Sequence, residues 1–64
     1  MKYQYYITDT MDGAVRGTND HQTAKIYAES EDYFVVDATT GEWLHADGTR
    51  MPVEPSMILP PEDA

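Results

Sequence analysis

The pattern of apolar and polar residues at the start of the chain predicts a β-hairpin. Over residues 2–8 the apolar side chains recur with a period close to two, as in a strand with one covered face. The residues expected to point into the core are Tyr3, Tyr5 and Ile7. Asp12-Gly13 is a turn signal, because glycine accepts positive φ without strain. A short antiparallel second strand is expected over residues 14–17.

The strongest strand pattern lies in the middle of the chain. Residues 33–36 are four consecutive aromatic or β-branched residues, which favours a strand with both faces at least partly covered. The turn residues Thr40-Gly41 and an extended pattern over 42–44 follow, so this region is predicted to form a second hairpin. Residues 49–53 are expected to add a short strand that Pro52 keeps at an edge or ends.

Residues 20–30 fit both a helix and a strand. Three residues suited to cap a helix precede or open the stretch: Thr18, Asn19 and Asp20. In a helix, one apolar stripe at i, i+3 and i+4 consists of Ala24, Tyr27 and Ala28. In a strand, the alternating residues are instead Ala24, Ile26 and Ala28. We choose the helix because of the capping residues, and expect it to lie on the sheet.

These elements predict a small α+β domain of order ββαββ, with an antiparallel sheet and one helix on one face. The domain covers residues 1–54, and residues 55–64 form a Pro-rich acidic tail. Within the tail, residues 57–59 are an apolar patch that either packs on the domain or docks on a partner, and residues 62–64 are expected to be disordered. The alternative fold is an all-β barrel of five or six strands, because the turn signals recur at near-regular intervals.

Composition limits the classes of function. The chain has 64 residues, no cysteine, and 12 acidic against 4 basic residues, for a formal charge of −8. A surface of this charge repels phosphates and anionic lipids, so neither direct nucleic-acid binding nor membrane binding is expected. No apolar run approaches the length of a membrane span and no secretory signal is present, so the expected location is cytoplasmic.

Catalytic and metal-binding patterns are weak. His21 and His45 are the only histidines, and Ser30 and Ser56 lack the strained-elbow sequence of a serine nucleophile. The pair His45-x-Asp47 has no second cluster of ligands at a defined spacing. The sequence therefore predicts a protein that is not an enzyme and has no cofactor and no metal site.

Binding is the chemistry that the aromatic residues favour. If Phe34 and Val36 join the core under the helix, the opposite sheet face is left with an aromatic patch, a feature typical of interfaces. The residues predicted to contact a partner through this patch are Tyr6, Tyr33, Val35 and Trp43. Two alternatives remain: Trp43 belongs to the core, or residues 57–59 cover the patch. A predicted acidic rim consists of Glu29, Glu31 and Asp32, with Asp37 and Glu42 expected nearby across the sheet.

In size, acidity and lack of catalytic groups, the chain resembles the small accessory proteins of bacteriophages and other mobile elements. That resemblance implies an inhibitor or adaptor that binds and modulates a host protein, and the charge favours a partner with a basic surface. One alternative is a DNA mimic whose carboxylates occupy a basic nucleic-acid groove. The other is a structural protein that forms homodimers or larger homo-oligomers through the aromatic face.

Overall fold

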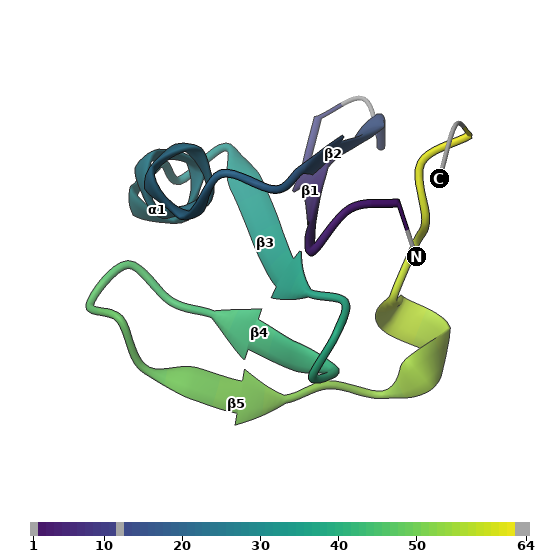
Figure 1. Cartoon of the computed structure of the whole chain (residues 1–64). Helices are drawn as coiled ribbons and strands as arrows, with labels where there is room; N and C mark the ends of the chain where they lie inside the picture. Colours follow the sequence, from purple (N-terminus) through teal and green to yellow (C-terminus); the bar gives the residue numbers. More distant parts are fainter. Residues whose placement is uncertain (1, 12, 63–64) are drawn as a thin grey trace.

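The part of the chain that the structure describes folds into five strands, one α-helix and one short 3-10 helix, and Figure 1 shows how they are arranged. The computed structural model describes residues 2–11 and 13–62. In chain order the elements are β1 (Tyr5–Asp9), β2 (Val15–Thr18), α1 (His21–Glu29), β3 (Tyr33–Asp37), β4 (Glu42–Leu44), β5 (Arg50–Pro52) and the 3-10 helix η1 (Pro55–Met57).

The five strands form one antiparallel sheet in the order β2-β1-β3-β4-β5. β1 and β2 are a hairpin, β3 to β5 are a meander, and the β1–β3 pairing joins the two units. The predicted α+β class with one helix is confirmed, and the short strand ending at Pro52 lies at the sheet edge as expected. The barrel alternative is wrong, because β2 and β5 do not pair and the sheet stays open.

Helix α1 begins where the sequence places a capping residue. The Asp20 carboxylate accepts a hydrogen bond from the Gln22 backbone N–H at 3.1 Å and from the Thr23 hydroxyl at 2.7 Å. Asp20 is thus the N-cap, and it supplies an acceptor for an N–H that has no partner within the helix. Asn19 has another role, because its side chain accepts from the Gln4 backbone N–H and donates to the Lys2 carbonyl. The helical interpretation of residues 20–30 is confirmed.

The core lies between α1 and one side of the sheet, which we call the helix side. Its buried residues are Tyr5, Ile7, Ala24, Val35 and Leu44, and Tyr27, Ala28 and Tyr33 pack against them. The predicted stripe on α1 therefore does face the sheet. In the β1–β3 register, Ile7 pairs with Val35 and Asp9 pairs with Tyr33, so these side chains share one side. The prediction that Phe34 and Val36 lie under the helix is wrong, because both point to the opposite side.

The opposite side of the sheet, which we call the tail face, is partly covered by the end of the chain. Its strand residues are Tyr6, Thr8, Val15, Gly17, Phe34, Val36, Trp43 and Met51, as the alternation of side chains and the registers require. Figure 1 shows η1 and the yellow C-terminal segment on the far side of the sheet from α1. Tyr6, Val36 and Pro61 are buried there. The tail thus gives this small domain a second apolar layer.

Two glycines carry specific geometric demands. Gly41 has φ of +73° in the β3–β4 turn, which favours glycine, and its N–H donates to the Asp37 carbonyl at 2.8 Å. Gly17 leaves no room for a side chain, because a Cβ atom at this position would overlap the ring of Tyr3. The Tyr3 ring therefore covers the tail face at β2, so the expectation that Tyr3 shares the core side with Tyr5 and Ile7 is wrong. Two earlier expectations, the Asp12 part of the first turn and disorder at residues 63–64, lie outside the described residues.

Candidate partner-binding surface

An apolar patch occupies the β3–β5 half of the tail face. We define this apolar patch as Phe34, Trp43, Met51, Met57 and Leu59. Met51, Met57 and Leu59 are 55%, 47% and 46% exposed, and the two aromatic residues are half-buried. The rings of Phe34 and Trp43 lie 4.6 Å apart, centre to centre, and the His45 ring stacks on Trp43 at 4.2 Å. These contacts hold the aromatic side chains in place while one part of each stays open to solvent.

Two shallow hollows lie on either side of Met57. The first, which we call the Trp43 hollow, is lined by Trp43, Met51, Pro52, Val53, Glu54, Pro55 and Met57. The second, which we call the Phe34 hollow, is lined by Thr8, Thr10, Phe34, Ser56, Met57 and Leu59. Because Met57 is the residue that both share, η1 forms the ridge between them. The patch therefore has relief suited to receiving protruding side chains.

The two sides of the sheet differ completely in charge. The charged residues of the strands are Asp9, Arg16, Asp37, Glu42 and Arg50. Alternation and register place all five on the helix side, and all strand residues are among those that the structure describes. The strands therefore present no charged side chain on the tail face. An apolar surface without strand charges is easier to desolvate than a charged one, which suits an interface core.

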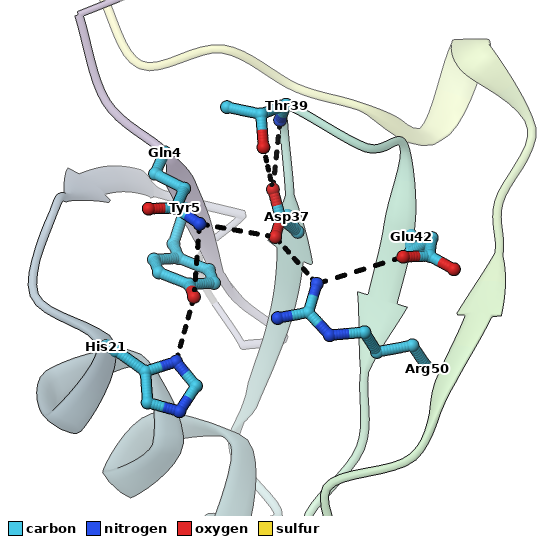
Figure 2. Close-up of polar contacts among 7 residues, drawn as sticks. All are labelled: Gln4, Tyr5, His21, Asp37, Thr39, Glu42 and Arg50. Carbon is cyan, nitrogen blue, oxygen red and sulfur yellow. Dashed lines mark hydrogen bonds and ion pairs between the residues drawn. The ribbon is translucent and has the colours of Figure 1, made fainter.

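On the helix side, a polar network connects the helix to the last strand (Figure 2). Asp37 is 1% exposed, and its Oδ2 lies 2.6 Å from an Arg50 nitrogen and 3.5 Å from the Gln4 amide nitrogen. Its Oδ1 accepts hydrogen bonds from the Thr39 backbone N–H at 3.0 Å and hydroxyl at 2.6 Å. Arg50 also lies 3.8 Å from Glu42. The buried carboxylate is thus compensated on both oxygens.

The same network continues to α1 through Tyr5. The Gln4 amide donates to the Tyr5 hydroxyl at 3.3 Å, and that hydroxyl shares a hydrogen bond of 2.8 Å with His21 Nδ1. Burial, the largest influence on Asp37, raises the pKa of its carboxyl, but hydrogen bonds from Thr39 and Arg50 outweigh burial and lower the pKa overall. The hydrogen bond to Asp37 in turn raises the pKa of Arg50. These groups hold each other in their charged forms, which is a structural role.

The structure separates the residues predicted to contact a partner. Trp43 lies in the apolar patch. Tyr6 is on the same face but is 4% exposed beneath other residues. Val35 is fully buried on the helix side, and Tyr33 is half-buried there with its ring 4.6 Å from that of Tyr27. The predicted grouping of these four on one exposed face is therefore wrong. Residues 57–59 do lie on the tail face, where Met57 lines a hollow with Trp43 and another with Phe34, but they leave Trp43 half-buried and not covered.

The predicted acidic rim is also divided. Glu29, Glu31 and Asp32 are exposed at the end of α1 and in the turn before β3. Asp37 and Glu42, which pair across β3 and β4, lie at the other end of β3. Five strand residues span roughly 16 Å at about 3.3 Å per residue, so the two acidic groups are not neighbours. Asp37 is in addition paired with Arg50.

Sequence reasoning missed Phe34 and Met51, and it treated residues 57–59 as a separate apolar patch and not as part of the same surface as Trp43. A signal was present for Phe34, because it alternates with Val35 and must oppose whichever face that residue takes. The tail residues were recognised as apolar, but their contact with the sheet depends on the path of the chain after β5. No local pattern specifies that path.

Comparisons with protein-family models, with curated proteins and with solved structures gave no match for this chain. Within residues 2–11 and 13–62, no helix has the length and apolar character needed to cross a membrane. The same residues contain no group of three or more His, Asp or Glu side chains placed to hold a metal ion.

Proposed function

We propose that this protein is a small acidic binding protein without enzymatic activity, which docks on another protein through the apolar patch. The observation that carries the proposal is the exposure of Met51, Met57 and Leu59 beside the half-buried Phe34–Trp43 pair. Exposed apolar residues that gather on one face mark interaction sites, whereas single exposed ones do not. Tryptophan at the centre of such a patch is the residue type most often found to dominate binding.

The size of the molecule is consistent with this role. A standard interface removes about 800 Å² of surface from each partner. The chain exposes 4191 Å² in total, so such an interface would use about a fifth of its surface.

Modulation of a host protein by a phage-like accessory protein, in the cytoplasm, is the more specific form of the proposal. Its support is the combination of small size, a charge of −8 and the absence of cysteine. The DNA-mimic alternative has less support, because the exposed acids at the end of α1 and the paired Asp37 do not form one continuous acidic surface. The homo-oligomer alternative predicts that the chain has the mass of a dimer or larger assembly in solution.

Capture from a bacterial lysate with two matched variants tests the proposal. Met57→Gln removes an apolar side chain from the patch, and Ile26→Gln removes one that is 65% exposed on α1, on the other side of the sheet. We expect one protein to be retained by the wild type and by Ile26→Gln, and to be reduced at least about tenfold on Met57→Gln. Retention that is equal on all three proteins, or no stoichiometric partner at all, would refute the proposal.

A further inference from the structure

The basic residues of the chain lie away from the apolar patch. Arg16 and Arg50 are on the helix side, and Lys25 is exposed on α1 itself. Lys2 lies 5.6 Å from the centre of the Tyr3 ring, which covers Gly17 at the β2 end of the sheet. Since β2 and β5 are opposite edges, Lys2 is at the end of the tail face remote from the patch. Within the described residues, no Lys or Arg lines either hollow.

Acidic residues, by contrast, lie at both ends of the patch. Glu54 is exposed and lines the Trp43 hollow. At the other end, Thr10 lines the Phe34 hollow, and both its hydroxyl and its backbone N–H donate to the Asp32 carbonyl, at 2.9 and 3.0 Å. That contact places the exposed Asp32 next to the Phe34 hollow, and the exposed Glu31 precedes it in the same turn. The apolar patch, with its two hollows, is thus bordered by negatively charged side chains at each end.

From this arrangement we infer the chemistry of the partner, an inference that rests on the proposed function. The occupant is an amphipathic protein segment that places two apolar side chains in the hollows and Lys or Arg residues beside Glu54 and beside Glu31 and Asp32. Opposite charges around an apolar contact speed association and align the partners. A second copy of this chain is a poor occupant, because two molecules of charge −8 repel each other and neither presents a Lys or Arg among the described residues that line the hollows.

Synthetic peptides titrated against the full chain test this inference, with Trp43 as the reporter, because it is the only tryptophan and lies in the patch. Two probes contain only Leu and Lys, one with a helical period and one with strict alternation, since either backbone can present an apolar stripe. The matched peptides replace every Lys by Glu, or every Leu by Ser. We expect at least one Leu/Lys peptide to shift Trp43 emission to shorter wavelength and to bind at least about tenfold more tightly than its matched peptides.

Charge substitutions at one site locate the contact. Met57→Lys is expected to weaken binding of the Leu/Lys peptide more than Met57→Glu does, by about fivefold or more, because the added base repels the lysines. Ile26→Lys, on α1, is the control and is expected to change the Kd less than about twofold. Equal binding of the Ser/Lys peptide would show that charge alone acts. Equal binding of the Leu/Glu peptide would show that the acids at the ends of the patch play no part. Either result overturns the inference.

Two further outcomes separate this inference from the proposed function. If neither Leu/Lys peptide binds, but lysate capture retains a protein that depends on Met57, the proposed function stands and the inferred partner chemistry is wrong. If the chain has the mass of a dimer at micromolar concentration and Met57→Lys makes it monomeric, the occupant is a second copy. That result would overturn the inference as well.

Discussion

Replacing Arg50 by methionine is the sharpest test of how the helix side is stabilised. The substitution keeps an unbranched apolar side chain at this position and removes the guanidinium that lies 2.6 Å from Asp37 Oδ2. In the variant that oxygen keeps only the Gln4 amide, at 3.5 Å, while Oδ1 keeps both hydrogen bonds from Thr39. One oxygen of a buried carboxylate thereby loses its strongest partner.

The structure sets the size of the effect. Removing one member of a fully buried ion pair costs about 3–5 kcal/mol. The Arg50 side chain, however, is 31% exposed, so water can reach part of the vacated space. The expected loss is therefore about 2 kcal/mol, the scale of a hydrogen bond to a charged group. A core of this size rarely supplies more than about 3–5 kcal/mol in total, so Arg50→Met removes close to half of the stability.

Urea unfolding followed by Trp43 fluorescence measures this loss. For a small domain the slope is about 1 kcal/mol per molar urea, so the midpoint should fall by about 2 M. Arg16→Met is the matched control, because Arg16 is an exposed arginine on β2, and its expected change is within about 0.5 kcal/mol. Should Arg50→Met leave too little folded protein, Arg50→Lys keeps the charge and gives a smaller loss of the same origin.

The pH dependence gives an independent check. The pKa of Asp37 is lowered in the folded protein from its ordinary value of 3.8. A lowered pKa contributes stability that is complete above the unfolded-state pKa and is lost as the pH falls through the folded-state pKa. Without Arg50, one of the hydrogen bonds that lower this pKa is lost, so the pKa of Asp37 in the variant lies above that in the wild type. The gap in stability between wild type and variant should therefore narrow below about pH 4, where the carboxyl takes up a proton in both. A gap that is the same at pH 7 and pH 3, or below about 0.5 kcal/mol at pH 7, would refute the reasoning.

Three other changes have outcomes that the structure predicts. Gly17→Ala should destabilise the fold by about 1–3 kcal/mol in urea unfolding, because the added Cβ meets the Tyr3 ring. The double variant with Tyr3→Ala should lose less stability than the sum of the two single variants, and strict additivity would contradict a clash between the two side chains. Asp20→Ala should cost about 1 kcal/mol and reduce helical circular dichroism on heating, because α1 loses its N-cap; unchanged melting would contradict it. A chain truncated to residues 1–54 should bind a hydrophobic dye and melt less cooperatively, because the tail face loses the apolar layer to which the buried Pro61 belongs. A sharp transition at the wild-type temperature would show that the tail contributes nothing.

Much of the fold could be predicted from local signals in the sequence. The alternation in β1, the helix cap at Asp20 and the turn at Gly41 are each contained within a few neighbouring residues. The sequence therefore predicts the presence of the first strand, the helix and the β3–β4 hairpin correctly. The short strand β5 was also predicted, since Pro52 restricts it to an edge. What these signals share is that no distant part of the chain is needed to interpret them.

The side to which each residue of β3 points could not be predicted in the same way. Residues 33–36 are all apolar, so their pattern does not say whether Tyr33 and Val35 or the alternating pair Phe34 and Val36 face the helix. That choice depends on the pairing of Ile7 with Val35, which the connection through α1 determines, and a shift of one residue exchanges the faces. The same ambiguity affects the candidate site. The sequence correctly indicates Trp43 as part of the binding surface, but it places Tyr33 and Val35 beside Trp43, where the structure has Phe34.

The strand order also determines how the chain reaches its folded state. The β1–β2 hairpin and the β3–β5 meander each connect neighbouring strands through short turns, whereas β1 meets β3 only after α1 and both of its loops have been brought into place. Closing that larger loop costs more entropy than closing either unit, so we expect the seam between β1 and β3, where Ile7 pairs with Val35, to form last among the strand pairings and to limit the folding rate. Substitutions along this seam should slow folding, while those confined to β5 should mainly accelerate unfolding.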